Sequence, residues 1–255
     1  MKKIALVTAA SSVLGKKISE KLIKEGYYVY AGVRDLKEDV IKSKYIGVVI
    51  LDVTNNSQIK GVFNKIMKEQ GKLDLLVNVA GITINGLTID TKEEDFKQML
   101  DVNVLGVFRM IKQFIPLLKK KNNSKIINIT SMTGIASFPN AVCYSASKHA
   151  LEALGQGVRS ELLKHHIWTT NIAPGAIDSG KKVTLNYKPM REKYKLIKYL
   201  FPMVTYDKVA SAVVDIANSD EPPMHVLLGN DAKVVYFIKK LFPDFLWDRT
   251  LRFLW

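Results

Sequence analysis

The sequence lacks the residues that build disulfides and most metal sites. Its single cysteine, Cys143, cannot form an internal disulfide or a cysteine-rich metal centre. Three of the four histidines, His149, His165 and His166, have no carboxylate or cysteine at metal-ligand spacing. We therefore predict no metal site.

Signals for export are also missing. The first fifteen residues, MKKIALVTAASSVLG, imitate a signal peptide but contain no A-x-A cleavage site. A lone cysteine is typical of proteins in a reducing compartment. We expect a cytoplasmic protein.

The sequence has no Pro/Gly/Ser-rich spacer, no low-complexity segment and no internal repeat. Its 255 residues, of which 47% are hydrophobic, suffice for one core of full size. We therefore predict a single domain over residues 1–255.

Acidic residues are outnumbered by basic ones, 24 against 38, and the net charge of +14 raises the question of an anionic partner. Most of the positive charge comes from lysines that are scattered along the chain, and the longest basic run is Lys119–Lys121. Nucleic-acid-binding proteins favour clustered arginine with aromatic residues between. We expect no nucleic-acid partner.

Apolar runs are short but recur regularly, at residues 4–8, 28–33, 47–51, 73–80, 125–130, 168–173 and 224–229. Segments with helical periodicity lie between them. This alternation predicts an α/β fold, a doubly wound parallel sheet of about seven strands with helices on both faces. Residues 180–204 break the alternation and are predicted to form a substrate-covering segment.

Polar or small residues follow most of the predicted strands. In a doubly wound fold the carboxyl ends of the strands line one crevice, so we expect the chemistry at this rim. The residues concerned are Thr8, Arg34, Asp52, Asn78, Ser131 and Pro174.

Tyr144 and Lys148 open a long helical segment with a spacing of four, which places both side chains on one face. A neighbouring ammonium favours the phenolate, and this matters because a free tyrosine has a pKa of about 10. Ser131 ends the preceding strand and could hold a substrate oxygen beside the phenol. Either feature alone is common in proteins, and the interpretation depends on their combination.

Seven short motifs in order make the chain resemble the short-chain dehydrogenase/reductase family from about residue 2 to residue 218. The motifs are TAASSVLG (8–15), LDV (51–53), NVAG (78–81), DVNVLG (101–106), ITS (129–131), YSASK (144–148) and PGAIDS (174–179). The resemblance implies a Rossmann-type fold and an NAD(P)-dependent oxidoreductase that interconverts a carbonyl and an alcohol. It also implies catalytic roles for four residues, Asn103, Ser131, Tyr144 and Lys148.

In the family, Tyr144 corresponds to the general acid/base, and Lys148 to the residue that holds the nicotinamide ribose and lowers the tyrosine pKa. Ser131 corresponds to the anchor of the substrate carbonyl, and Asn103 to the residue that places a water in a proton relay. The resemblance further implies a set of cofactor contacts. These are Thr8, Ala10, Ser11, Ser12, Leu14, Arg34, Asp52, Val53, Asn78, Ala80, Gly81, Tyr144, Lys148, Pro174, Gly175, Ile177 and Ser179.

The end of the second predicted strand indicates the choice of cofactor. A carboxylate there would accept from a ribose 2′-hydroxyl and repel a 2′-phosphate. This chain has Val33 followed by Arg34, whose guanidinium suits a phosphate. NADP(H) is therefore favoured over NAD(H), although Asp35 could instead pair with Arg34.

The turn at residues 8–15 contains one glycine, Gly15, where nucleotide-binding turns usually contain several. Ala9 adds only a methyl group. Val13 is the larger departure, because a β-branched residue would crowd the pyrophosphate or, if φ must be positive, cost about 1–2 kcal/mol. We expect weakened rather than abolished dinucleotide binding.

The tail, residues 230–255, is rich in aromatic residues, and its longest apolar run, Val234–Ile238, is too short to span a bilayer. Members of the family that the chain resembles commonly pair through their long helices and cover the substrate cleft with their C-terminal segments, so the resemblance implies a lid and subunit contact in a homo-oligomer, a dimer or tetramer. Peripheral membrane contact is the second interpretation. The apolar tail resembles the C-terminal part of steroid and retinol dehydrogenases within the family, and this resemblance implies a hydrophobic small-molecule substrate, such as a lipid, steroid-like or retinoid-like carbonyl.

Two other functions remain open. One is 3-oxoacyl-[acyl carrier protein] reductase, whose acidic carrier would dock on the basic residues between Lys181 and Lys198. The other is a dinucleotide-binding regulator without turnover, which Val13 alone supports.

Overall fold

The computed structural model describes residues 2–178, 202–241, 245, 247–249 and 252. Ser179, most of the predicted substrate-covering segment at 180–204 and several residues of the tail beyond 241 lie outside this part.

The described strands form one parallel sheet in the order β3-β2-β1-β4-β5-β6-β7. Each of the seven lies within two residues of its predicted position, so the predicted α/β sheet is confirmed. The strands are β1 (Lys3–Val7), β2 (Tyr27–Val33), β3 (Ile46–Ile50), β4 (Leu75–Asn78), β5 (Ser124–Ile129), β6 (Ile167–Pro174) and β7 (His225–Leu228).

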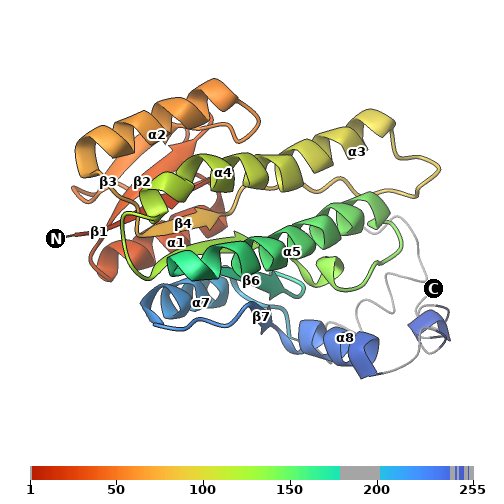
Figure 1. Cartoon of the computed structure of the whole chain (residues 1–255). Coiled ribbons are helices and arrows are strands. Elements are labelled where there is room, and N and C mark those ends of the chain that lie inside the picture. The colour runs from red at the N-terminus through yellow and green to blue at the C-terminus, as the bar shows by residue number, and fades with distance from the viewer. Residues whose placement is uncertain (1, 179–201, 242–244, 246, 250–251, 253–255) are drawn as a thin grey trace.

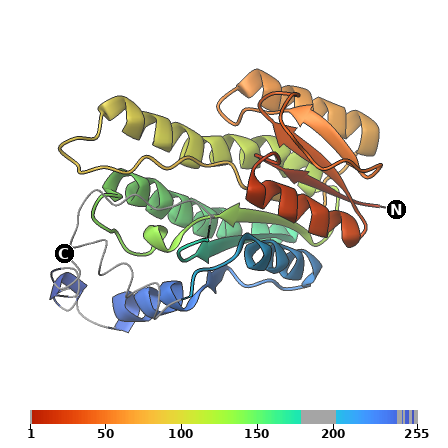
Figure 2. The ribbon, with the colours of Figure 1, turned by 180° about the vertical axis from the view of Figure 1, so that it is seen from behind.

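Helices cover both faces of this sheet, which is why its central strands are apolar on both sides. The regular helices are α1 (Val13–Lys24), α2 (Asn56–Gln70), α3 (Glu93–Leu100), α4 (Val107–Leu118), α5 (Val142–Leu162), α7 (Tyr206–Asn218) and α8 (Asn230–Leu241). Figure 1 shows α2, α4 and α5 in front of the sheet, and Figure 2 shows α1 and α7 in front of the opposite face.

Two apolar clusters fill the two interfaces. On the first face, Ile18 of α1 and Val213 of α7 pack with Val29 and other side chains of the sheet. On the second face, Ile66 of α2, Phe114 of α4 and other apolar residues pack with the alternate side chains of the same strands. The sheet is thereby held on both sides, and its carboxyl edge is a rigid base for a site.

The strand order reverses between β1 and β4, since the chain first proceeds outward to β3 and then returns to β4. The loops that follow β1 and β4 diverge at this point and leave a crevice between them. Two short helical segments border the rim in the described part of the chain: a π-helix, η1 (Asp101–Gly106), and a 3₁₀ turn, η2 (Met132–Gly134). A second 3₁₀ turn, η3 (Leu163–His165), leads into the amino end of β6 at the opposite edge. Short π-helical turns are frequent at functional sites.

Candidate active site

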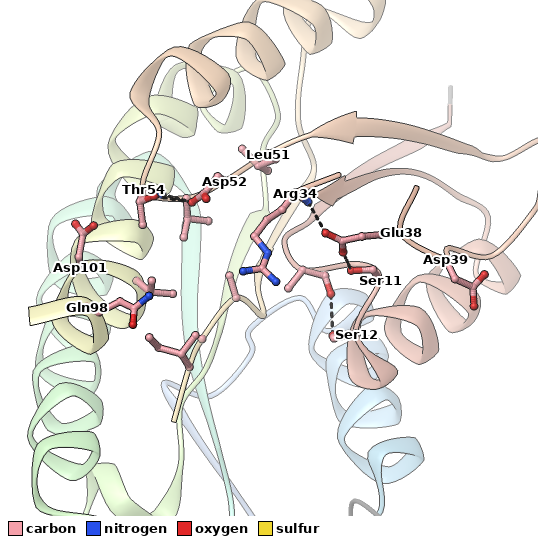
Figure 3. A pocket seen from close by; sticks show the side chains of 16 residues that line it. Ser11, Ser12, Arg34, Glu38, Asp39, Leu51, Asp52, Thr54, Gln98 and Asp101 are labelled. Carbon is pink, nitrogen blue, oxygen red and sulfur yellow. Dashed lines mark hydrogen bonds between the residues drawn. The ribbon is translucent and has the colours of Figure 1, made fainter. Parts of the chain in front are cut away.

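A cavity of about 660 Å³ opens at the crevice, beside the carboxyl ends of β1, β2 and β4. Its volume is in the range of small-molecule and cofactor sites. Seven predicted cofactor residues line it: Ser11, Ser12, Arg34, Asp52, Val53, Ala80 and Gly81. Gln98 and Asp101 face these residues across the cavity in Figure 3.

The turn after β1 holds α1 against the rim through Gly15. A Cβ atom at Gly15 would overlap the Ala9 carbonyl oxygen and lie 2.8 Å from Ala10 Cα. Both neighbours are backbone and cannot move aside cheaply. Ser12 caps the helix, because its Oγ accepts from Gly15 N at 3.0 Å. Gly15 is thus required for the close packing of the helix on the turn.

Backbone strain in this turn lies at Ala9 and not at Val13. Ala9 has a φ of 50°, in the left-handed region that disfavours a side chain. Val13 is the first residue of α1, has no positive φ, and its side chain is 55% exposed. The condition for strain at Val13, a positive φ, is therefore not met, because the helix begins at that residue.

Thr8 holds the two sides of the crevice together. Its hydroxyl oxygen accepts from Val79 N and Ala80 N, both at 2.9 Å, and the residue is buried. Ala10, Leu14 and Asn78 are likewise buried and do not line the cavity. These four predicted contacts lie beneath the cavity surface.

Arg34 extends its guanidinium into the cavity (Figure 3). Among the described residues this guanidinium has no hydrogen bond or ion pair. Asp35 does not pair with it and accepts from Lys37 N at 2.9 Å instead. Opposite, the Asp52 carboxylate is fixed by the Thr54 N–H at 2.8 Å and the Thr54 hydroxyl at 2.7 Å.

Tyr144 and Lys148 lie on one face of α5, as their spacing predicts. Lys148 Nζ is 5.7 Å from the centroid of the Tyr144 ring. Lys148 is 5% exposed, and its ammonium donates one hydrogen bond to a described residue, to Ile129 O at 3.0 Å. A Cβ atom at Gly81 would lie 3.6 Å from Lys148 Nζ, so the ammonium borders the cavity lining.

Asn103 lies in the π-helix η1 and is fully buried. Its amide pairs twice with Ile82, accepting from N at 2.8 Å and donating to O at 2.9 Å. It also donates to Ser147 Oγ at 3.0 Å, and that hydroxyl donates to Tyr144 O at 2.7 Å. Asn103 thereby joins the loop after β4 to the first turns of α5.

Ser131 follows β5 and caps η2, where its Oγ accepts from Thr133 N at 3.1 Å. Between Ser131 and Tyr144 the chain presents Phe138, whose ring packs edge-to-face on Trp247 with centroids 5.9 Å apart. Trp247 is 9% exposed. The described part of the tail therefore contacts the loop that joins Ser131 to Tyr144.

The segment after β6 is fixed by a residue that the sequence analysis missed. Asp231, on α8, accepts from Ala176 N at 2.7 Å, and a Cβ atom at Gly175 would overlap its carboxylate. Pro174 ends β6, Gly175 and Ile177 lie in the segment that follows, and none of the three lines the cavity. The contact joins positions far apart in the sequence, so no local pattern signals it.

A model of one family, described as short chain dehydrogenase, matches residues 3–189. The chain belongs to this family. It is therefore an oxidoreductase that acts on alcohol and carbonyl groups, with the Rossmann-type sheet of its relatives.

Three similar proteins illustrate the family. The 3-ketodihydrosphingosine reductase of Bacteroides thetaiotaomicron is 29% identical, over 98% of this chain and 96% of that protein. The 3-oxoacyl-[acyl-carrier-protein] reductase FabG of Thermotoga maritima is 32% identical, over 75% of this chain and 77% of that protein. A short-chain dehydrogenase of Burkholderia cenocepacia, solved in complex with NADP, superposes with a TM-score of 0.83 at 25% identity, over 98% of both chains.

Beneath the short-chain dehydrogenase site runs a buried amide ladder, which the sequence analysis also missed. Asn78 donates to Asn128 Oδ1 at 2.9 Å, and Asn128 donates to Asn171 Oδ1 at 3.0 Å. Asn171 donates to both the backbone oxygen and the carboxylate of Glu152, at 3.0 and 2.8 Å. The ladder crosses β4, β5 and β6 and ends on α5, the helix of Tyr144 and Lys148.

Glu152 ends this ladder in a buried position. Thr130 donates a short hydrogen bond to its Oε1, and His225 Nε2 lies 3.4 Å from the same atom. Burial raises the pKa of the Glu152 carboxyl, but His225 and the bonds from Thr130 and Asn171 outweigh it, so the net pKa is lowered. The carboxylate is thus stabilised in its charged form.

Within the described residues, no three His, Cys, Asp or Glu side chains gather as metal ligands would. Likewise, no described helix is long and apolar enough to cross a bilayer.

Proposed function

We propose that the chain is an NADP(H)-dependent short-chain oxidoreductase that interconverts a carbonyl and an alcohol on a hydrophobic substrate. Tyr144 acts as general acid or base on the substrate oxygen. Ser131 orients that oxygen, Lys148 favours the tyrosinate, and Asn103 connects the site to solvent through a water.

The observation that carries this proposal is the buried ammonium of Lys148. It lies 5.7 Å from the phenol ring and donates one bond, to a neutral carbonyl, within the described part of the chain. A buried cation without an anionic partner among the described residues favours negative charge nearby, and in this proposal the Tyr144 side chain is the group beside it that gives up a proton. Its two remaining N–H donors suit ribose hydroxyls.

The residues of the cavity fit a nicotinamide dinucleotide that carries a 2′-phosphate. The N-terminus of α1 suits the pyrophosphate, Asp52 and Val53 suit the adenine, and the Arg34 guanidinium suits the 2′-phosphate. The Burkholderia cenocepacia relative solved with NADP supports the same choice. When bound, the cofactor supplies or accepts the hydride.

The chain's own residues then move one proton. In reduction, the Tyr144 phenol donates its proton to the oxygen of the carbonyl that Ser131 holds. The positive charge of Lys148 stabilises the resulting tyrosinate. Asn103 holds Ile82 and Ser147 in place, which keeps the path from Lys148 to solvent aligned.

A hydrophobic substrate is supported by the aromatic contact between Phe138 and Trp247, beside the loop from Ser131 to Tyr144. One relative that matches almost the full chain is a 3-ketodihydrosphingosine reductase, named for a long-chain ketone. The second candidate is reduction of a 3-oxoacyl thioester on acyl carrier protein, which the similarity to FabG favours.

The deciding experiment is carbonyl-dependent oxidation of NADPH by the wild type and by Tyr144→Phe. The panel contains a long-chain 3-keto sphingoid base and a 3-oxoacyl thioester of acyl carrier protein. We expect the Phe variant to lose about 10²–10⁴-fold in kcat and to keep its affinity for NADPH, because only the proton donor is removed.

Tyr45→Phe is the matched control, since Tyr45 precedes β3 at the amino edge of the sheet, away from the rim. It should keep full activity. Binding of NADPH without turnover of any carbonyl would favour a regulator, and turnover retained in Tyr144→Phe would refute the assignment of the acid/base.

We further propose that the chain forms a homo-oligomer and that its tail makes protein contacts. The buried Trp247 supports the protein contact, whereas the exposed Phe237, Leu241 and Phe245 support contact with a membrane surface. Light scattering tests the oligomer. Co-sedimentation of the full chain and a 1–232 truncation with anionic liposomes tests the membrane, because equal failure of both would exclude it.

A further inference from the structure

Glu38 places a carboxylate inside the predicted phosphate site. Its Oε1 accepts from Arg34 N at 3.2 Å and from Asp35 N at 3.1 Å. Its Oε2 accepts a short hydrogen bond from the Ser11 hydroxyl. Figure 3 shows this carboxylate between Ser11 and the backbone of Arg34, within the lining of the cavity.

The three donors come from two different segments and converge on one point. Ser11 belongs to the turn after β1, and the two N–H groups belong to the loop after β2. Adjacent backbone N–H groups and a hydroxyl that point together form a concave anion site. The local turn that returns Glu38 to these donors is closed by its own N–H, which donates to Asp35 O at 3.0 Å.

The Arg34 guanidinium lies beside this anion site but does not take part in its hydrogen bonds. It extends into the cavity and has no ion pair within the described part of the chain, Glu38 included (Figure 3). The site therefore combines a free cation with neutral donors that an internal anion already occupies.

We propose that Glu38 sets the discrimination between dinucleotides with and without a 2′-phosphate, because a 2′-phosphate must displace its carboxylate from Ser11 and the two N–H groups. This inference rests on the proposed function. A phosphate monoester carries a charge of about −1.5 to −2 at neutral pH, so it is repelled by the carboxylate and competes for the same donors. A 2′-hydroxyl has no such conflict, since it can donate to a carboxylate.

The displacement needs no change of fold. Glu38 is partly exposed, and the residues that follow it, 39–43, form no helix or strand. A rotamer change moves the carboxylate into solvent and frees the donors. Glu38 thus opposes Arg34, and the wild-type preference for NADP(H) is smaller than Arg34 alone would produce.

The test compares Glu38→Gln with Asp39→Asn, a matched control at the same rim. Asp39 is the next residue, lines the same cavity, and pairs with Lys16 rather than with the converging donors. Both substitutions remove one negative charge, but only Glu38→Gln removes it from the anion site. Thermal unfolding checks that both variants remain folded.

Calorimetry measures the affinities of 2′,5′-ADP and of 5′-ADP, which differ in the 2′-phosphate and need no turnover. We expect Glu38→Gln to tighten 2′,5′-ADP by about tenfold, the lower end of what a like charge within about 4–6 Å contributes. The affinity for 5′-ADP should stay within about twofold, and Asp39→Asn should change both ligands little, since exposed charges are screened.

The role of Glu38 is overturned if Glu38→Gln tightens the binding of both ligands equally, or if both proteins bind the ligands with the same ratio of affinities. The proposed function stays intact in either case. Failure of all proteins to bind 2′,5′-ADP and NADPH overturns both. If the wild type turns over no carbonyl but Glu38→Gln shifts the ratio of the two affinities as expected, only the proposed function is refuted.

Discussion

Gly155 and Gly157 lie two residues apart on α5 but have opposite surroundings. A Cβ atom at Gly155 would overlap Asn171 Oδ1 and lie 2.6 Å from both Asn171 Cγ and Nδ2. A Cβ atom at Gly157 meets nothing within 4 Å. We therefore predict that the same substitution, glycine to alanine, changes stability in opposite directions at these two positions.

The magnitudes follow from the contacts of Asn171. Alanine stabilises a helix interior by about 1 kcal/mol relative to glycine, so Gly157→Ala should raise the free energy of unfolding by this amount. Gly155→Ala gains the same but displaces a buried amide that bonds to Asn128 and Glu152. Unsatisfied buried groups cost about 1–3 kcal/mol each, so the loss of two such bonds, less the helical gain of about 1 kcal/mol, leaves a net loss of about 1–5 kcal/mol.

Thermal and chemical unfolding of the two variants measure this difference. For a chain of this size about 2–4 °C correspond to 1 kcal/mol, so Gly155→Ala should unfold several degrees below the wild type. Gly61→Ala on α2, where a Cβ atom also meets nothing within 4 Å, is a second control outside α5. A Gly155→Ala protein as stable as Gly157→Ala would refute the close packing of α5 on Asn171.

Two further outcomes test the turn and the end of the ladder. Ala9→Gly should raise Tm by about 2–4 °C. Relief of the positive φ stabilises the folded state by about 1–2 kcal/mol, and the greater conformational freedom of glycine in the unfolded chain removes part of this gain. A lower Tm would contradict the strain at Ala9. Because the pKa of Glu152 is lowered on folding, its carboxylate contributes stability above the usual glutamate pKa of about 4.3, and this is lost as pH falls through the folded pKa. Glu152→Gln should therefore be less stable than the wild type at pH 7. Unfolding curves should show that this difference in the free energy of unfolding shrinks towards pH 3. A difference that grows with acid would count against the charged form of Glu152.

The sequence patterns predicted the seven strands because each strand of a parallel sheet is a short apolar run that is buried on both faces. The pair of Tyr144 and Lys148 was predictable for a similar reason, since a spacing of four in a helix determines that two side chains share a face.

The exact environment of a residue did not follow from the sequence. The strain at Val13 was conditional on a positive φ, and the structure shows that the positive φ lies at Ala9, because α1 begins at Val13. Thr8 was predicted as a cofactor contact, and the structure shows its hydroxyl bonded to the loop after β4. In both cases the sequence located the turn but not the direction of each group.

The sequence by itself determined the fold class, the position of the rim and the chemistry that α5 presents, because these depend on periodicities within a few residues. Only the tertiary structure decided that Glu38 occupies the donors beside Arg34, that Asp231 fixes the segment after β6, and that Asn171 packs on Gly155. The last two contacts join residues far apart in the chain, and the Glu38 contact depends on how its loop turns back towards Ser11. The packing of helices on the sheet brings such groups together, and no local pattern encodes which of them meet.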